Sequence, residues 1–365
     1  MRHQFRVKLN EKGGAIMSTA KEKYIAYAGT YTLGSSKGIH IFDMDVLAGR
    51  ITERKEIEIN NPSYIVMSPN KDFLYSICDE GVTAFKILED GDLSYINTSS
   101  IKGMRGCHLS TNKANTLLFV SGYHDGKITV MHINPDGSIG DIADEVYHKG
   151  MGSIADRNFR PHISYATLTP DEEYLCVCDL GIDQVKLYQV NAFGKLKLVD
   201  VIRTQLETAP RMILFSPDGL FAYVVCELKN IIDVYSYNKD AKTKFEFIQS
   251  IFTVRGANKA ISAASCITMS SDGEYLFCSN AGDNSITTYK RDTKTGMLTT
   301  KSCLPVSGDY PKDICLFPDD KHILSLNHEA GTITTFTLNY EKALIVMNGP
   351  ILKIDKPNNI VYKKL

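Results

Sequence analysis

A repeat of roughly fifty residues constrains the fold of this chain more than any other feature of its sequence. Each copy contains a run of eight residues in which apolar and polar side chains tend to alternate, as they do in a strand with one buried face. The fifth position of the run is always Phe, Met or Tyr. The copies are Gly38–Asp45, Gly81–Leu88, Lys127–Asn134, Gln184–Asn191, Ile231–Asn238, Ser285–Asp292 and Thr332–Asn339.

The segment Ala209–Asn238 shows how one copy is built. Two apolar runs, Pro210–Phe215 and Phe221–Cys226, precede the alternating run, and polar turns separate the three. The first turn contains Pro and Asp-Gly, which favour the backbone angles of tight turns. Several short strands in a repeat of this length are typical of a propeller blade. We therefore predict an all-β chain that forms a seven-bladed β-propeller with four-stranded antiparallel blades.

The N-terminal copy is incomplete, and the C-terminus supplies what it lacks. Tyr24–Thr32 resembles a second strand with no first strand before it, whereas Lys356–Lys363 resembles a first strand with nothing after it. We expect the C-terminal strand to pair into the N-terminal blade, because closing the ring removes exposed strand edges. The propeller would then span 23–365. Residues 1–22 are polar and unpatterned, so we expect a disordered or non-native extension, with Met17 as the native start.

Composition excludes several classes of partner. The formal net charge of −1 provides no basic surface for nucleic acid or for an anionic membrane. No apolar run is long enough to cross a bilayer, and no secretory leader pattern is present, so a cytoplasmic protein is expected. The nine cysteines lie mostly within apolar runs and lack zinc-site spacing, which indicates core filling, with no metal and no cofactor. We expect a monomer or a weak homodimer.

Two polar insertions interrupt the repeat. They are Asp144–Asn158 and Arg255–Ala264, and each comes just before the first strand of a copy. Loops at equivalent positions of successive blades lie on the same face of a propeller. We therefore expect both insertions to form loops on one face, where they would make a rim or lid over the tunnel.

Polar side chains cluster at one position of the repeat. In an antiparallel blade the first strand starts beside the end of the second, so these positions meet at one mouth of the central tunnel. Unpaired charges are costly to bury, so these groups must pair with one another or bind a ligand. The candidates from strand starts are Ser63, His108, His162, Arg211 and Lys312, and those from strand ends are Tyr31, Asp79, Tyr123, His124, Asp179, Glu227, Asn280, Asn327 and His328.

Arg211 and Glu227 are the strongest pair among these candidates, because one repeat brings both to the same mouth. For most of the others, a structural role as polar groups that cap the tunnel is the competing interpretation. His108 and His162 fit both interpretations equally well.

At these residues the chain resembles the lactonase family of seven-bladed propellers, from about Tyr24 to Tyr362. The motifs that carry the resemblance are Tyr27-Ala-Gly-Thr-Tyr-Thr, Gly106-Cys-His-Leu-Ser, Pro161-His162 with Asp179-Leu-Gly-Ile-Asp183, Ala209-Pro-Arg211 with Cys226-Glu227-Leu, Ser279-Asn280 and Tyr310-Pro-Lys-Asp313. The chain departs from the family pattern at Ser164, Met212, Ala281 and Lys312, where members carry two histidines and two arginines. Fewer fork-shaped cations leave fewer ways to bind phosphate.

The resemblance implies a hydrolase of carbohydrate metabolism that opens a sugar lactone, as 6-phosphogluconolactonase-like members do. Glu227, or neutral His162 or His108, would take a proton from the attacking water, and Arg211 would contact the developing oxyanion or a substrate anion. The implied catalytic residues are Glu227, Arg211 and His162. The implied substrate-binding residues are His108, Asp179, Asn280, Lys312 and Tyr123, with Arg160 as a further anion contact.

Two alternatives use the same tunnel mouth. One is a cycloisomerase that forms a lactone from an unsaturated diacid, as muconate-lactonizing members of the family do. The other is a propeller that binds a lactone or sugar acid without turnover, because a fold does not dictate an activity.

Overall fold

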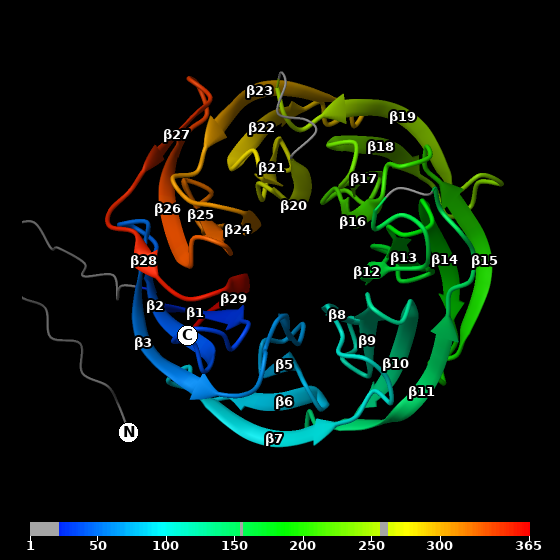
Figure 1. The fold of residues 1–365 in the computed structure, drawn as a ribbon, viewed down its shortest axis with the longest axis horizontal. Coiled ribbons are helices and arrows are strands. Elements are labelled where there is room, and N and C mark those ends of the chain that lie inside the picture. Colours follow the sequence, from blue (N-terminus) through cyan, green and yellow to red (C-terminus); the bar gives the residue numbers. More distant parts are fainter. Residues whose placement is uncertain (1–21, 154–155, 256–261) are drawn as a thin grey trace, which may run out of the picture.

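Seven antiparallel sheets surround a central tunnel in the computed structural model, which describes residues 22–153, 156–255 and 262–365. Within these ranges all the regular structure is strand. Figure 1 shows the sheets as blades of a ring seen along its axis. In six blades the chain runs from an inner strand at the tunnel to an outer strand at the rim, whereas the inner strand of the N-terminal blade comes from the C-terminal segment. The predicted all-β, seven-bladed propeller is confirmed.

The blades have the following strands, given from the tunnel outward. The N-terminal blade contains β29 (Pro357–Lys364), β1 (Tyr24–Thr30), β2 (Gly38–Asp45) and β3 (Arg50–Glu58). The second blade contains β4 (Ile65–Met67), β5 (Phe73–Cys78), β6 (Gly81–Ile87) and β7 (Leu93–Ser99), and the third contains β8 (His108–Thr111), β9 (Leu117–Gly122), β10 (Lys127–Ile133) and β11 (Ile139–Tyr147). The fourth blade contains β12 (Ile163–Leu168), β13 (Leu175–Asp179), β14 (Gln184–Val190) and β15 (Leu196–Arg203). The last three contain β16 (Pro210–Phe215), β17 (Phe221–Cys226), β18 (Ile231–Tyr237) and β19 (Phe245–Phe252), then β20 (Ala263–Met269), β21 (Tyr275–Ala281), β22 (Ser285–Arg291) and β23 (Leu298–Pro305), then β24 (Pro311–Leu316), β25 (His322–Asn327), β26 (Thr332–Asn339) and β27 (Leu344–Met347), with a short strand β28 (Leu352–Lys353) that also pairs with β26.

The two ends of the described chain complete one blade, as predicted. β29 pairs antiparallel with β1, in a register that runs from Tyr24 opposite Lys364 to Thr30 opposite Pro357. In Figure 1 the red C-terminal strand lies beside the blue N-terminal one, at the tunnel. Every inner strand therefore has a partner on its outer side, and the ring has no open seam.

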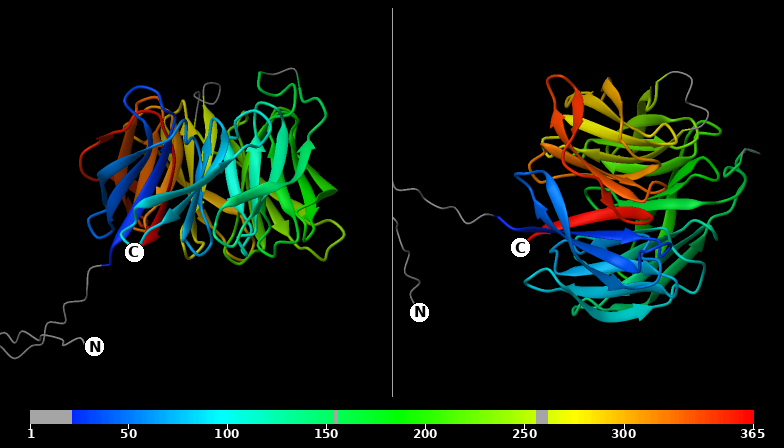
Figure 2. Two further views of the ribbon diagram at one scale, coloured as in Figure 1. Left: turned by 90° about the horizontal axis from the view of Figure 1, so that it is seen from below. Right: turned by 60° about the vertical axis from the view of Figure 1, so that its left-hand side comes forward.

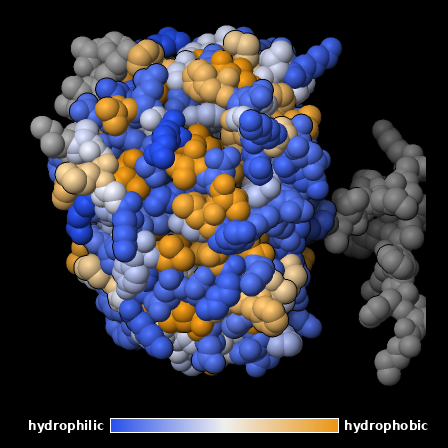
Figure 3. All heavy atoms as spheres, turned by 90° about the vertical axis from the view of Figure 1, so that its right-hand side faces the viewer, coloured by the Kyte–Doolittle hydropathy of each residue, from blue (hydrophilic) through white to orange (hydrophobic). Residues whose placement is uncertain are grey.

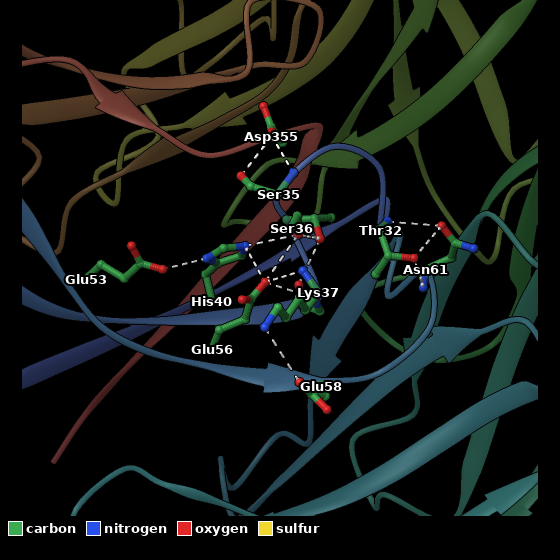
Figure 4. Close-up of polar contacts among 12 residues, drawn as sticks. Thr32, Ser35, Ser36, Lys37, His40, Glu53, Glu56, Glu58, Asn61 and Asp355 are labelled. Atoms are coloured by element: carbon green, nitrogen blue, oxygen red, sulfur yellow. Dashed lines mark hydrogen bonds and ion pairs between the residues drawn. The ribbon is translucent and has the colours of Figure 1, made fainter.

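Polar contacts strengthen this closure on the loop between β1 and β2 (Figure 4). The backbone N–H and the hydroxyl of Ser35 both donate to Asp355, at 2.7 and 2.8 Å. On the other side of the loop, the N–H of Thr32 donates to the side chain of Asn61, which precedes the next blade. Because Asp355 lies just before β29, these contacts tie the C-terminal segment and two blades together.

The hydrophobic core consists of seven layers, one between each pair of neighbouring blades. Each layer packs the face of one twisted sheet against the next, so each blade buries both of its faces. The large residue at the fifth position of the repeat is buried in all seven copies, namely Phe42, Phe85, Met131, Tyr188, Tyr235, Tyr289 and Phe336. The repeat is thus visible in the sequence because the same packing is needed seven times.

The outer strands carry a different surface. Figure 3 shows the side of the ring formed around β15, where apolar side chains lie among mostly hydrophilic ones. Leu198 of β15 and Phe247 of β19 are among the exposed apolar residues. Within the described residues, no helix is long and apolar enough to cross a membrane. All nine cysteines are free thiols.

One predicted loop differs from the structure. The segment from Asp144 to Tyr147 belongs to β11, and the described parts of the loop are 148–153 and 156–162. The outer strand extends further than expected because its exposed residues are polar and carry little apolar periodicity. The loop rises above one face of the ring (Figure 2, left). Much of the second predicted loop, Arg255–Ala264, lies outside the described residues, as do 1–21 with Met17.

Candidate active site

A cavity of about 320 Å³ occupies one mouth of the tunnel. Every blade contributes to its wall at least one residue that lies at the start of the inner strand or directly before it, and further residues come from the ends of second strands and from loops. The inner-strand contributors are Tyr64, Cys107, His108, Ser164, Tyr165, Arg211, Met212, Ser265, Cys266, Lys312, Asp313, Asn358 and Asn359; the others are Tyr31, Arg105, Gly106, Tyr123, His124, Arg157, Glu227 and Tyr310.

A β-bulge turns Arg211 into this cavity. Pro210 pairs with Cys226 and Met212 pairs with Val225, so Arg211 is an extra residue without a partner in the ladder. Bulges of this kind redirect a side chain and are common beside functional sites. The same extra residue occurs at the start of three other inner strands, at Ser164, Lys312 and Asn358. The fold thus points one side chain from each of these strands into the mouth of the tunnel.

Hydrogen bonds link the bulges around the ring. The Ser164 hydroxyl donates to the carbonyl of Arg211 at 2.7 Å. Arg211 Nε donates to the carbonyl of Ser265 at 3.0 Å, and the Ser265 hydroxyl donates to the carbonyl of Lys312 at 2.9 Å. The bulges at Arg211 and Lys312 are therefore each held by a hydroxyl group of the blade before, which fixes the direction of the two cationic side chains.

Glu227 lies between two arginines at this mouth. Arg211 Nη1 contacts its Oε2 at 2.5 Å, and Arg157 Nη1 contacts its Oε1. The Glu227 side chain is only 3% exposed, whereas Arg211 and Arg157 are 28% and 40% exposed. Burial opposes the charge on Arg211, but the adjoining carboxylate outweighs it and raises the pKa of the guanidinium above its usual value. The three groups together carry one net positive charge, at the surface that a ligand would meet.

Buried polar groups anchor the loop that delivers Arg157. His148, at the start of the loop, contacts Asp179 through Nδ1 at 2.7 Å and Tyr188 through Nε2 at 3.0 Å. Asn158, at the other end, donates its side-chain amide to the carbonyl of Leu180 at 2.7 Å. These anchors are buried, so the backbone beside Arg157 is tied to the body of the propeller.

A second cationic group lies around Tyr31. The Arg105 guanidinium and the Lys312 ammonium lie 5.0 and 5.1 Å from the centre of its ring. Arg105 also pairs with Asp79 at 2.7 Å. Burial lowers the pKa of Lys312 to about 8, and the neighbouring Arg211 adds to this effect. Lys312 is therefore charged near neutrality but loses its proton on mild alkalinisation.

The inner part of the cavity is less polar. His108 lies between two tyrosine rings, with centroids 3.8 Å from Tyr165 and 4.6 Å from Tyr64. Burial lowers the pKa of His108 to about 3, so its imidazole is neutral near pH 7. Asp313 accepts a hydrogen bond from the Cys266 thiol at 2.9 Å, and burial raises its pKa to about 6.

The structure brings together some of the predicted site residues and separates others. Of the eight residues implied as catalytic or substrate-binding, five line the cavity, namely Arg211, Glu227, His108, Tyr123 and Lys312, and two further candidates, Tyr31 and His124, line it as well. His162 does not line it but stacks on Tyr123, with ring centroids 4.4 Å apart, and contacts the Tyr123 carbonyl through Nδ1 at 2.7 Å. Its place is therefore behind Tyr123.

Asp179 and Asn280 also lie outside the cavity lining. Asp179 is fully buried, where it contacts His148 and accepts the backbone N–H of His162 at 2.8 Å. Asn280 donates its amide to Thr253 and to two hydroxyl side chains within its own blade. Both side chains thus hold the ends of strands and loops, and the prediction that they contact substrate has no support in this geometry.

Two arginines of the cavity, Arg105 and Arg157, were not among the predicted residues. Both belong to segments that precede an inner strand and have no periodic pattern. Arg157 lies within the insertion Asp144–Asn158, which the sequence analysis predicted as a rim loop. A cationic residue in a predicted rim loop was therefore the feature from which Arg157 could have been identified as a site residue. The two guanidiniums supply fork-shaped donors that the family pattern led us to think were missing.

Within the described residues, no three His, Cys, Asp or Glu side chains are grouped as metal ligands would be. The donors of the cavity are mainly cationic and hydroxyl groups, which suit an anionic organic ligand.

The fold and the site together define a seven-bladed propeller with a carboxylate and several cationic side chains clustered at the mouth of its tunnel. The chain belongs to the family described as "Lactonase, 7-bladed beta-propeller", whose model matches residues 25–362. It is 30% identical over 348 residues to the 6-phosphogluconolactonase of Bacillus subtilis (strain 168), and the match covers 92% of this chain and 97% of that protein.

Two solved structures share the architecture. A protein from Lactobacillus plantarum is 28% identical, with a TM-score of 0.86, and the match covers 94% of this chain and 99% of that one. The periplasmic gluconolactonase of Pseudomonas aeruginosa, 23% identical, superposes with a TM-score of 0.88 over 93% of this chain and 99% of that one, which shows the common fold.

Proposed function

We propose that this protein hydrolyses a lactone of a sugar acid, with Glu227 as the general base. The observation that carries the proposal is the position of Glu227, a buried carboxylate that lines the tunnel mouth and contacts a guanidinium on each oxygen. The family to which the chain belongs and the Bacillus 6-phosphogluconolactonase that it resembles support the same reaction class.

The reaction needs one water and no other reactant. The water oxygen attacks the carbonyl carbon of the lactone while Glu227 takes its proton, which typically accelerates such a step by about 10²- to 10⁴-fold. Negative charge develops on the carbonyl oxygen, and Arg211 and Lys312 stabilise it from the bulges that direct them into the cavity. The bond between the carbonyl carbon and the ring oxygen then breaks, and the ring oxygen receives the proton from Glu227. The product is the open hydroxy acid.

Neutral and polar groups of the cavity suit the rest of a sugar. The imidazole of His108 is neutral and accepts the backbone N–H of Ala166 at Nδ1 (3.3 Å), so its Nε2–H can donate a hydrogen bond to a sugar oxygen. Oδ1 of Asn358 is buried and has no hydrogen-bond partner among the residues that the structure describes, which makes it an acceptor. In this proposal His162 holds Tyr123 in place and takes no proton.

The cavity also favours a substrate with negative charge. Four cationic side chains line it, namely Arg105, Arg157, Arg211 and Lys312, against two carboxylates, Glu227 and Asp313. A cleft dominated by one sign of charge attracts ligands of the opposite sign and speeds their association. A phosphorylated lactone such as 6-phosphoglucono-1,5-lactone therefore fits the site better than an uncharged one.

A panel of lactones tests the proposal. The purified protein is assayed by pH-stat with 6-phosphoglucono-1,5-lactone, glucono-1,5-lactone and a simple aliphatic lactone, each against its spontaneous hydrolysis. Glu227→Gln keeps the shape of the side chain but removes the base, so we expect kcat to fall about 10²- to 10⁴-fold. Glu246→Gln on the exposed face of β19 is the matched control.

Two results would contradict the proposal. If Glu227→Gln hydrolyses the lactones as fast as the unaltered protein, the base is wrongly assigned. If the unaltered protein accelerates no lactone and yet binds sugar acids in a thermal-shift assay, the chain is a non-catalytic binder.

A further inference from the structure

The two arginines that contact Glu227 have different supports. Arg211 comes from a strand and is held a second time, because its Nε donates to the carbonyl of Ser265. Arg157 comes from the loop between β11 and β12, and its guanidinium is the more exposed of the two. A long side chain on a loop can change partner at lower cost than one fixed at both its Nε and its Nη1.

The resting contacts of Glu227 also oppose its chemistry. Each of its oxygens accepts a hydrogen bond from a guanidinium. Transfer of a proton to this carboxylate would leave two buried or half-buried cations without their anion, which is costly. Removal of one arginine from the carboxylate lowers that cost and uncovers an oxygen toward the cavity.

The backbone holds Arg157 where such an exchange is possible. Arg157 has a φ of 61°, in the left-handed region that non-glycine residues seldom adopt. Asn158, directly after it, is fully buried and bonded to Leu180 and Asp183. The Cα of Arg157 is thus fixed at the mouth of the cavity, and only the side chain needs to move to meet a ligand.

We propose that Arg157 is the specificity-determining residue of this site, because a phosphate or carboxylate group on the substrate takes its guanidinium and thereby frees Oε1 of Glu227 for the attacking water. The inference rests on the proposed lactone hydrolysis. The anionic group gains a charged hydrogen bond, Arg157 keeps an anionic partner, and Glu227 keeps Arg211. A neutral lactone offers Arg157 no replacement for Glu227, so it meets a base that is still doubly paired.

Kinetics with charged and uncharged lactones test this exchange. We expect the unaltered protein to prefer 6-phosphoglucono-1,5-lactone over glucono-1,5-lactone in kcat/KM. Arg157→Ala removes a charged hydrogen bond to the anionic substrate, so the kcat/KM of this variant for the charged lactone should fall about 10- to 100-fold. For the neutral lactone, kcat should rise, because Glu227 is freed without a ligand.

Variants with matched charge separate this role from a structural one. Arg157→Lys retains a cation and should restore part of the preference for the charged lactone. Lys149→Ala removes an exposed positive charge from the same loop, away from the cavity lining, and should leave the ratio unchanged. If the ratio of the two kcat/KM values in Arg157→Ala equals that of the unaltered protein, the assignment is wrong.

A binding experiment tests the inference without turnover. Isothermal titration compares gluconate, which has one carboxylate, with 6-phosphogluconate and glucarate, which add a phosphate and a second carboxylate. We expect one of the two acids with a second anionic group to bind more tightly than gluconate, and this gain to disappear in Arg157→Ala. A gain that persists in Arg157→Ala overturns the inference. If the gain depends on Arg157 but no lactone is hydrolysed, the anion contact stands and the proposed hydrolase fails.

Discussion

Asn158 donates its side-chain amide to the carboxylate of Asp183 at 3.0 Å. The same carboxylate accepts the backbone N–H groups of Ala209 and Glu207, each at 2.9 Å. Asn158 follows Arg157 directly, and Ala209 comes two residues before Arg211. One buried carboxylate therefore links the two backbone segments that carry the arginines on either side of Glu227.

Asp183 is accordingly expected to act as a positioning residue. Asp183→Ala leaves buried donors unsatisfied, which costs about 1–3 kcal/mol of stability each. We expect a lower melting temperature and a fall in kcat/KM of about tenfold or more, because loss of alignment at a site is costly. Asp183→Asn keeps one carbonyl acceptor and should lie between the two.

The measurement that distinguishes alignment from stability is the preference between charged and neutral lactones at a temperature well below unfolding. If Asp183→Ala is destabilised but retains the full preference, Asp183 supports the fold and not the arginines.

From the lowered pKa of Lys312 we expect ligand binding and stability to depend on pH in opposite directions. Because burial lowers its pKa to about 8 from 10.5, its charge is lost as the pH rises through about 8, and binding of an anion such as glucarate should weaken there. Between about 8 and 10.5 the unfolded chain holds a proton that the folded chain has released, so this residue makes the folded state more stable as the pH rises.

Titration of glucarate by calorimetry and chemical denaturation across this range measure the two effects. Lys312→Arg stays charged and should remove both. Persistence of the binding step near pH 8 in Lys312→Arg would assign it to another group.

A variant at Asn359 of β29 measures how much ring closure contributes to the free energy of unfolding. Its side chain accepts the N–H of Ile65 at 3.0 Å and donates to the carbonyl of Ile65 at 2.9 Å, which joins the N-terminal blade to the next one. Asn359→Ala removes both bonds in a buried place and should lower the free energy of unfolding by about 2–4 kcal/mol, on the usual cost of unsatisfied groups. Urea denaturation measures the change.

Asn339→Ala is a suitable comparison, because that side chain accepts one exposed turn N–H, from Lys342. Equal losses in the free energy of unfolding of the two variants would show that the contact between the blades stabilises the protein no more than an exposed turn hydrogen bond does.

His162 stacks on Tyr123, and a variant that keeps this stack can separate a positioning role of His162 from a catalytic one. His162→Phe retains an aromatic ring against Tyr123 but cannot take a proton, so we expect kcat to change by less than about tenfold. A loss of about 10²- to 10⁴-fold, the usual contribution of a general base, would make His162 the base in place of Glu227. Single-turnover assays with the charged lactone measure this difference.

The sequence predicts much of the architecture because the same physical requirement recurs. Phe42 and its six equivalents fill the same position between blades, so the third strand of each blade was located to within a residue. The closing pair of β29 and β1 followed from the missing strands. The outer strands were harder to place, since β15 exposes most of its residues and packs few of them.

The candidate site was only half visible. Arg211 and Glu227 were found because they occupy equivalent ends of paired strands in one repeat. Arg105 and Arg157 come from irregular segments, where the chain direction depends on buried anchors such as Asn158. The bulges at Arg211 and Lys312 each add one residue to a strand, and nothing in the residue types marks such an addition.

The pairing of β29 with β1 also sets the order in which this molecule matures. Asn358 and Asn359 form part of the cavity wall, and they belong to β29, which is synthesised after all the other described strands. Six blades can assemble while synthesis continues, but the pocket stays unfinished until residues 357–364 reach the first strand. The cavity wall is therefore complete only after the strands of the other blades have been synthesised.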